Sequence, residues 1–268
     1  MPSYNVIGVQ VDAVSIEDVV RRMEEWIAAR DRVHQLAMVN AHTAADTVRN
    51  PTWAQVISQA DLRLPDGSPI WAIGRLNGFP IPRRVEGLEL MDAFFRVAAQ
   101  KGYRSFFYGA GPGVGERVGE YMTRNFPGAV FAGAYSPPYR DLTEEEDREI
   151  VAMINNAHPD VLWVSLGGSG PRGPKEHIWI YDHRDRLHVP VASGVGQAFD
   201  TLSGNKPRLP LWVRRWGLEW LVRMIRERRT HFRRYLVYNT FFLFYLAQDA
   251  LGIGPTFRKQ QALAKEKH

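Results

Sequence analysis

The sequence predicts an α/β fold: a Rossmann-like, mostly parallel sheet with helices on both faces, followed by a C-terminal helical appendage. Short apolar runs alternate with amphipathic stretches along most of the chain, which is the pattern of strands and helices taking turns. Glycine-rich turns follow several of the apolar runs, and such turns at the carboxyl ends of parallel strands mark a ligand-binding crevice. From residue 211 onward the helical pattern continues without strand signals, which places the appendage there.

The first buried strand is predicted over residues 35–40, and a helix over residues 44–59 follows it. An apolar-acidic stretch then leads to a proline followed by Asp66 and Gly67. Asp-Gly after proline is a common turn. A carboxylate on a loop above the carboxyl edge of a sheet is also what a general base needs to take a proton from a hydroxyl nucleophile. Taken alone, Asp66 is therefore compatible with a turn or with a catalytic base.

A glycine-rich loop at residues 109–115 lies between a predicted strand, residues 104–109, and a helix that reaches about residue 125. Backbone N–H groups in such a loop can approach a phosphate at a helix N-terminus. The loop does not match the dinucleotide fingerprint, because Val114 occupies the place of its third glycine, and it lacks the Lys-Ser/Thr of a P-loop. A phosphate site and a tight strand–helix turn both fit these residues.

Further along the chain, Thr143 and Glu146 form a capping box, so a helix is predicted from there to about residue 155. A second glycine-rich loop, residues 167–173, follows a predicted strand. The remaining strands are predicted over residues 130–135, 161–166 and 189–193.

Beyond this second loop, Lys175, Glu176 and His177 offer a cation, a carboxylate and an imidazole. A lysine there would neutralise a diphosphate; the alternative is a solvated helix start, where a glutamate is favourable. His177 and His183 are six residues apart and not on one helix face, so they do not predict a metal pair. The chain has no Asp-x-Asp motif and no cysteine. We therefore expect no metal cofactor and no disulfide, and the charge of a leaving group would be met by Arg, Lys and backbone amides.

Positive charge is concentrated near the C-terminus. Residues 208–235 hold nine Arg and two Glu, a local charge of +7 in a chain of net charge +5. Aromatic residues are interspersed and an apolar stretch, residues 235–247, follows, which favours an interfacial helix on an anionic membrane. A solvated face of a core helix and a nucleic-acid-binding face are the alternatives. The stretch is about a third shorter than the roughly 20 residues that cross a bilayer, and residues 241–246 could instead cover another subunit in a homo-oligomer.

Several widely spaced motifs occur in one order along the chain, and together they resemble those of the WecG/TagA/CpsF family of bacterial glycosyltransferases over about residues 6–236. The motifs are Asn40 at a strand end; Ala60-Asp61 and then Pro65-Asp66-Gly67; Arg84-Val85-Glu86-Gly87; residues 109–114; Pro174-Lys175 with Trp179-Ile180; residues 194–200; Gly204 with Arg208 and Pro210; and residues 217–220 with Arg223.

The resemblance implies an inverting hexosyltransferase that moves an N-acetylmannosamine-type or related sugar from a UDP-sugar to a polyprenyl-diphosphate-linked saccharide in cell-surface polysaccharide synthesis. Asp66 falls where the family's proposed base lies, and it would deprotonate the acceptor hydroxyl. The resemblance assigns donor binding to Asn40, Gly109, Gly111, Gly113, Lys175, Glu176, Gly194, Gly196 and Gln197, and acceptor binding to Arg84, Arg208, Arg214, Arg223, Arg229 and Arg233.

The chain departs from the family where the resemblance places the donor. The family usually reads Pro-Lys-Gln-Glu where this chain ends in Glu176 and His177, the preceding loop is enlarged over residues 169–173, and Met38 replaces a threonine of some members. Two parts are expected: residues 1–207 as an α/β sugar-nucleotide-binding catalytic domain, and residues 208–268 as a basic-aromatic helical appendage for membrane or acceptor binding.

A non-catalytic, nucleotide-binding scaffold protein on the membrane is the alternative function, and the retained Asp66 argues against it. A nucleic-acid-binding protein would show steep salt dependence, but it leaves Asp66 and the glycine loops without a role. The imperfect fingerprint disfavours an NAD-dependent oxidoreductase. The N-terminus lacks a basic start followed by an apolar core, so we expect no secretory signal. The expected location is cytoplasmic, peripheral on the inner face of the cell membrane, with a UDP-sugar, a lipid-linked acceptor and the anionic membrane surface as partners and no nucleic acid.

Overall fold

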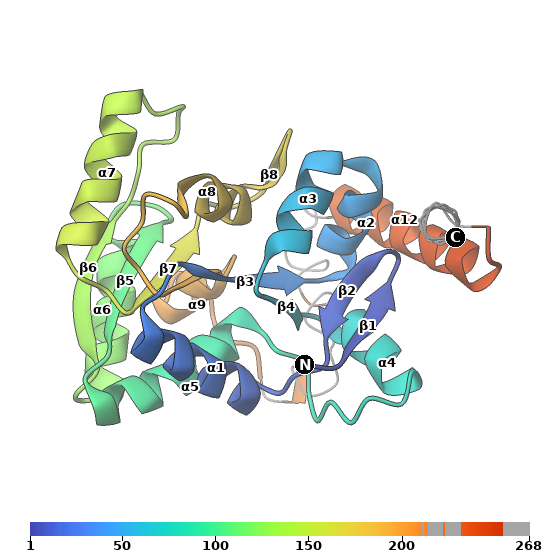
Figure 1. Cartoon of the computed structure of the whole chain (residues 1–268), viewed down its shortest axis with the longest axis horizontal. Helices are drawn as coiled ribbons and strands as arrows, with labels where there is room; N and C mark the ends of the chain where they lie inside the picture. The colour runs from blue at the N-terminus through green and yellow to red at the C-terminus, as the bar shows by residue number, and fades with distance from the viewer. Residues whose placement is uncertain (211, 214–221, 223–231, 254–268) are drawn as a thin grey trace.

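The computed structural model describes residues 1–210, 212, 213, 222 and 232–253. In the last of these segments the side chains are described from residue 240 to residue 253. Its centre is a six-stranded sheet in which every neighbouring pair is parallel, which confirms the predicted fold class (Figure 1). In spatial order the strands are β4 (Leu62–Pro65), β3 (His34–Val39), β10 (Val191–Gly194), β7 (Val161–Ser165), β5 (Arg104–Gly109) and β6 (Val130–Tyr135).

Helices cover both faces of this sheet (Figure 1), and two small antiparallel hairpins lie outside it. One hairpin is N-terminal, and the other forms within the second glycine-rich loop, where the sequence predicts only a loop. One face of the sheet carries α1 (Ile16–Ala29), α5 (Gly87–Lys101), α6 (Val114–Asn125) and α9 (Ala198–Leu202), and the other carries α2 (Ala41–Arg49), α3 (Pro51–Gln59), α7 (Glu144–Asn156) and α8 (Lys175–His183). In the N-terminal hairpin β1 (Ser3–Val6) pairs with β2 (Val9–Asp12), and α4 (Ser68–Leu76) lies next to β1. In the second hairpin β8 (Ser169–Gly170) pairs with β9 (Gly173–Pro174).

Strand β7 shows why the strands of this sheet have apolar residues at nearly every position in the sequence. Val161 and Trp163 pack into the core on the α5 face, whereas Leu162 and Val164 pack into the core on the α7 face. All five residues of β7 are buried. A parallel strand with helices on both sides needs apolar residues at every position, so the alternation of polar and apolar residues seen in half-exposed strands is absent here.

The single helix predicted over residues 44–59 is wrong, because the structure has two helices there. Asn50 ends α2 and caps α3, with its side chain accepting a hydrogen bond from the N–H of Trp53 at 3.1 Å. Pro51 is the first residue of α3 and has no N–H with which to continue α2. The resulting bend buries Trp53, whose Nε1 donates to the carbonyl oxygen of Thr43 at 2.7 Å.

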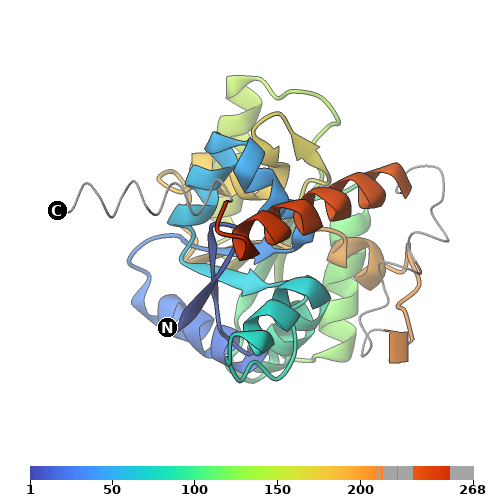
Figure 2. The ribbon, with the colours of Figure 1, turned by 90° about the vertical axis from the view of Figure 1, so that its right-hand side faces the viewer.

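The described part of the appendage is α12 (Phe232–Ala250), which packs along α2 (Figures 1 and 2). Phe242 is buried in the core beside α2 and α3, and the Arg49 guanidinium lies 4.7 Å from the ring centre of Phe241. Leu243 and Phe244 remain exposed, at 63% and 53%. Part of the predicted apolar face therefore covers this chain's own α2. Among the described helices, none is both long and apolar enough to cross a membrane.

Candidate active site

A cleft of about 2340 Å³ runs along the carboxyl edge of the sheet. It exceeds the roughly 300–1,000 Å³ of a typical small-molecule pocket, so it has room for two substrates. The residue that follows each strand lines it: Asp66 after β4, Asn40 after β3, Val195 after β10, Leu166 after β7, Ala110 after β5 and Ser136 after β6.

Most of the predicted site residues that the structure describes meet in this cleft. They come from segments far apart in the sequence, because a parallel sheet brings the carboxyl ends of all its strands to one edge. The predicted residues that line the cleft are Asn40, Asp66, Arg84, Gly111, Lys175, Glu176, Gly194, Gly196 and Gln197.

Asp66 is half-buried at one end of the cleft and is held by its neighbours. Its backbone N–H donates to the carbonyl oxygens of Val39 and Leu64, both at 2.9 Å. The Asn40 side chain donates through Nδ2 to Asp66 Oδ2 at 3.2 Å. The same Asn40 caps α2, with Oδ1 accepting from the N–H of Thr43 at 3.1 Å. Because Asn40 is fixed on both sides, the Asp66 carboxylate has a defined direction before any substrate arrives.

Arg84 presents a guanidinium on the wall of the cleft. Its Nε donates to the Glu86 carboxylate, and a terminal nitrogen donates to Ser68 Oγ at 2.7 Å. The side chains of Arg84 and Glu86 are only 11% and 18% exposed. Partial burial strengthens such a charge pair and limits its motion, so the guanidinium is oriented toward the cleft by two protein partners.

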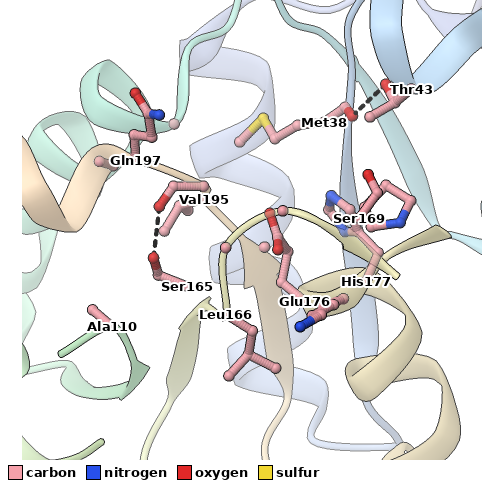
Figure 3. Close-up of a pocket in the computed structure, with 18 of the residues that line it drawn as sticks. Met38, Thr43, Ala110, Ser165, Leu166, Ser169, Glu176, His177, Val195 and Gln197 are labelled. Atoms are coloured by element: carbon pink, nitrogen blue, oxygen red, sulfur yellow. Dashed lines mark hydrogen bonds between the residues drawn. The ribbon is translucent and has the colours of Figure 1, made fainter. Parts of the chain in front are cut away.

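Glu176 and His177 line the cleft next to Gly194, the last residue of β10, and Figure 3 shows both side chains. A Cβ at Gly194 would lie 2.6 Å from Glu176 Cγ and 2.7 Å from His177 Cε1, so only glycine fits there. Both side chains are buried, and burial lowers the pKa of His177 to about 4. His177 is therefore a neutral imidazole at pH 7. Within the described part of the chain, its Nδ1 has no hydrogen-bond partner.

The glycine loops shape the cleft through their backbone. Gly109 has a φ of +106°, and a Cβ there would lie 2.2 Å from the carbonyl oxygen of Ser165. Ser165 Oγ donates to the carbonyl oxygen of Gly196 at 2.7 Å, which ties two loops together (Figure 3). Gly109 and Gly113 do not line the cleft. Neither α6 nor α8 has a side-chain N-cap hydrogen bond; instead the first N–H of each helix donates to a loop carbonyl oxygen, Val114 to Gly111 and Lys175 to Gly168.

The far end of the cleft carries aromatic residues, and two of them, Tyr108 and Tyr139, were not singled out from the sequence. Tyr139 is 98% exposed at the mouth, with Lys175 Nζ 5.4 Å from its ring centre. Tyr108 packs against Trp179 with ring centres 4.4 Å apart. The only signal for Tyr139 in the sequence is its place shortly after a predicted parallel strand, behind two prolines.

His183 serves a structural network beside this end. Its Nε2 lies 2.6 Å from Asp147 Oδ1 and its Nδ1 lies 2.7 Å from the Trp179 carbonyl oxygen, while Arg186 also binds Asp147. Burial alone raises the pKa of Asp147, but hydrogen bonds from Arg186 and His183 hold it below its usual value. Among the residues that the structure describes, no group of three or more His, Asp or Glu is arranged to hold a metal ion.

Arg208, predicted to bind the acceptor, lies outside the cleft lining. It contacts Asp92 Oδ2 at 2.7 Å, and Tyr121 donates to the other oxygen of Asp92 at 3.0 Å. Burial alone lowers the pKa of Arg208, but the Asp92 carboxylate raises it above its usual value. Arg208 thus connects to α5 and α6 through Asp92. Three other predicted acceptor residues, Arg214, Arg223 and Arg229, lie outside the described residues, and Arg233 lies in α12 where side chains are not described.

Comparison with known proteins identifies the family of this chain. Residues 4–254 match the family described as "Glycosyl transferase WecG/TagA/CpsF family". Three similar proteins are each named N-acetylglucosaminyldiphosphoundecaprenol N-acetyl-beta-D-mannosaminyltransferase. That of Bacillus spizizenii is 32% identical over 218 residues, 81% of each chain. That of Bacillus subtilis is 31% identical over 191 residues, 71% of this chain and 70% of the relative. That of Staphylococcus aureus strain MRSA252 is 25% identical over 222 residues, 82% and 84% of the two chains. The chain belongs to the WecG/TagA/CpsF family of glycosyltransferases.

Proposed function

We propose that this chain is an inverting transferase that moves N-acetylmannosamine, or a closely related hexose, from a UDP-sugar to a saccharide linked to a polyprenyl diphosphate in cell-surface polysaccharide synthesis. The observation that carries the proposal is Asp66, a half-buried carboxylate that Asn40 orients in a cleft large enough for two substrates. The printed names of the relatives support this choice of sugar and of a lipid-linked acceptor.

In this proposal Asp66 is the general base. It accepts the proton of an acceptor hydroxyl while that oxygen forms a bond to the anomeric carbon of the donor sugar. The bond between the anomeric carbon and the diphosphate oxygen breaks on the opposite face, and UDP leaves with that electron pair. One displacement inverts the configuration and needs no covalent intermediate.

The negative charge on the leaving UDP must be met by this chain's own groups. Lys175 and the N-termini of α6 and α8 supply positive charge and N–H donors along the same edge of the sheet. Gly111, between β5 and α6, lines the cleft at this point. We propose that these groups replace a divalent cation in binding the diphosphate.

The acceptor's lipid tail implies work at a membrane surface, and we propose that the chain binds the inner face of the membrane peripherally. Leu243 of α12 is 63% exposed and also lines the cleft, with the exposed Phe244 beside it. Exposed apolar residues next to the basic segment, residues 208–235, suit an interface with anionic lipid.

The test is transfer from UDP-N-acetylmannosamine to a synthetic N-acetylglucosaminyl-diphosphate lipid by the full chain. Asp66→Asn should lower kcat by about 10²- to 10⁴-fold, the usual contribution of a general base, with little change in the Kd of UDP. Asp185→Asn, at an exposed carboxylate outside the cleft, is the matched control and should retain full activity. Near wild-type turnover of Asp66→Asn would remove the assigned base.

Metal independence is tested separately by thermal shift. A ligand that binds the native state raises the melting temperature, so UDP and UDP-N-acetylmannosamine should raise it equally with and without EDTA. A shift or a turnover that EDTA abolishes, and that Mg²⁺ or Mn²⁺ restores, would contradict this part of the proposal.

A further inference from the structure

The link that leads from α9 into the basic segment, residues 203–209, passes along one wall of the cleft. Pro207 and Leu209 line the cleft, whereas Arg208 between them does not. The Arg208 guanidinium instead donates to Asp92 Oδ2 on α5, at 2.7 Å. The link therefore forms part of the cleft wall with some of its residues and is bonded to a neighbouring helix by another.

Asp92 is a carboxylate in an otherwise apolar part of α5. Its side chain is only 8% exposed. Both of its oxygens accept hydrogen bonds, Oδ2 from Arg208 and Oδ1 from the Tyr121 hydroxyl of α6, at 3.0 Å. A buried carboxylate is costly unless its partners are present, and removal of one partner leaves an uncompensated charge. The side chains around Asp92 thus hold Arg208 in one position.

A second contact ties the same link to α6. The Arg117 guanidinium donates to Asn205 Oδ1 at 3.1 Å. Arg117 and Tyr121 are four residues apart, so they lie on one face of α6. At the start of the link, the N–H of Lys206 donates to the carbonyl oxygen of Asp200 in α9 at 2.8 Å. The link is therefore held from α9, α5 and α6 before the chain enters the basic segment.

The anchor lies close to the cleft. Leu88, which lies one turn before Asp92 on α5, lines the cleft. Val222 and Leu243, which follow the link in the sequence, line it as well. The basic segment carries a local charge of +7, which suits an anionic diphosphate. By contrast, the groups proposed for the donor diphosphate, Lys175 and Gly111, belong to other elements.

We propose that Asp92 is a positioning residue for the lipid-linked acceptor. With Tyr121 it holds Arg208, so that Pro207 and Leu209 form a fixed wall and the basic segment starts at the cleft. Arg208 then acts through the protein and does not contact substrate. The inference rests on the proposed function, because it concerns the acceptor of the same reaction.

The test compares acceptor and donor in the full chain carrying Asp92→Asn or Arg208→Gln. A misplacement of about 1 Å costs about 100-fold in rate, so kcat/KM for the N-acetylglucosaminyl-diphosphate lipid should fall by about 10- to 100-fold in both variants. The Kd of the lipid, measured without donor by calorimetry, should rise by about tenfold or more. The Kd of UDP should stay within about twofold of wild type. Brief trypsin digestion followed by mass spectrometry should show faster cleavage after residue 208 in Asp92→Asn.

Asp160→Asn is the matched control for the loss of a buried carboxylate. Asp160 is also 8% exposed and paired with an arginine, Arg30, and it lies outside the cleft. This variant should lose stability, as Asp92→Asn does, and keep the wild-type KM and Kd for the acceptor lipid. The comparison separates positioning of the link from a general loss of folding.

Three results would overturn the inference. The first is an unchanged acceptor Kd and kcat/KM in Asp92→Asn. The second is an equal loss in Asp160→Asn, which would assign the effect to stability. The third is a loss in Arg208→Gln without one in Asp92→Asn, which would mean that Arg208 itself contacts the acceptor.

The proposed function can fail separately from this inference. A wild-type chain that binds the acceptor lipid, loses that binding in Asp92→Asn and transfers no N-acetylmannosamine would support the anchor while contradicting the proposed donor sugar. A wild-type chain that transfers N-acetylmannosamine, with Asp92→Asn equally active, would support the proposed function while overturning the anchor.

Discussion

The two ends of the cleft are built in different ways. At the β4 end, Asp66 is half-buried and is bonded to Asn40, which itself caps α2. At the β6 end, Tyr139 is almost fully exposed, and its position depends on hydrogen bonds made by the residues around it. The β4 end fixes the direction of the Asp66 carboxylate, whereas the β6 end exposes the ring of Tyr139 to solvent.

This difference matches the different demands of chemistry and binding. A general base must lie within hydrogen-bond reach of one proton, so its direction must be fixed. An exposed ring such as that of Tyr139 offers a stacking surface to a nucleobase, and such a surface tolerates small shifts because it contacts a whole planar ring. Mutations at the Asp66 end should therefore change turnover, and mutations at the Tyr139 end should change nucleotide affinity.

After Asp66→Asn itself, the largest expected effect comes from removing the orientation of Asp66. Asn40→Ala deletes the hydrogen bond to Asp66 Oδ2 and the N-cap of α2. Because a misplacement of about 1 Å can cost about 100-fold in rate, we expect kcat to fall by up to about 100-fold with the Kd of UDP unchanged. Loss of the cap should also lower the free energy of unfolding by about 1 kcal/mol.

Ser15→Ala is the matched control for this variant. Ser15 caps α1 through a capping box of the same kind, and it does not line the cleft. It should lower the free energy of unfolding by a similar amount and leave kcat intact. Equal losses of turnover in the two variants would mean that Asn40 acts only through helix stability.

The next effect concerns His177 and is a change in the free energy of unfolding with pH, not a change in turnover or in nucleotide affinity. Burial holds the pKa of His177 at about 4, below the value near 6.5 of an exposed imidazole. Between these values the unfolded chain binds a proton that the native state does not, so stability must fall as the pH falls. From pH 7 to pH 5, His177 should lower the free energy of unfolding by about 1–2 kcal/mol.

Urea unfolding of the wild type and of His177→Gln at both pH values measures this term. Glutamine does not titrate, so the variant should lose less stability on acidification than the wild type. His188→Gln, at an exposed histidine outside the cleft, should behave like the wild type. An identical pH dependence in His177→Gln would show that other groups account for the acid sensitivity.

The smallest effect is expected from loosening the Tyr139 segment. Arg140→Gln removes the bidentate contact to Glu146, an exposed pair that contributes little to stability. The Kd of UDP should rise by about two- to threefold, because part of the ordering of Tyr139 is then deferred to binding, and kcat should not change. Arg21→Gln breaks the comparable exposed pair with Asp18 on α1 and should leave the Kd of UDP unchanged. A fall in kcat for Arg140→Gln would contradict the division between the two ends.

The predictions from sequence were best where the structure depends on local contacts. The capping box of Thr143 and Glu146 forms as expected, with hydrogen bonds of 3.2 and 2.9 Å, because its partners are three residues apart. The bend at Asn50 and Pro51 was missed although its signal is local, because the apolar period continues through it. Strand β4, the N-terminal hairpin and helices α1, α4, α5 and α9 were not predicted either.

The sequence predicted which residues line the cleft better than it predicted their contacts. Asp66, Lys175 and Gly194 meet in one cleft because parallel strands place their carboxyl ends at one edge, which the alternating pattern implies. Arg208 was predicted to bind a ligand, and the structure pairs it with Asp92, 116 residues away. No local pattern links those two residues.

By itself, the sequence determined five of the six strands of the central sheet, helices α6 and α7, the glycine-rich turns and the edge of the sheet where the cleft lies, since these follow from periodicity and from residues within a few positions of each other. Only the tertiary structure decided that Asn40 orients Asp66, that Gly194 admits Glu176 and His177, and that Tyr139 stands beside Lys175. These contacts depend on the order of strands in the sheet and on close packing between distant segments, and no short-range pattern in the chain encodes either of them.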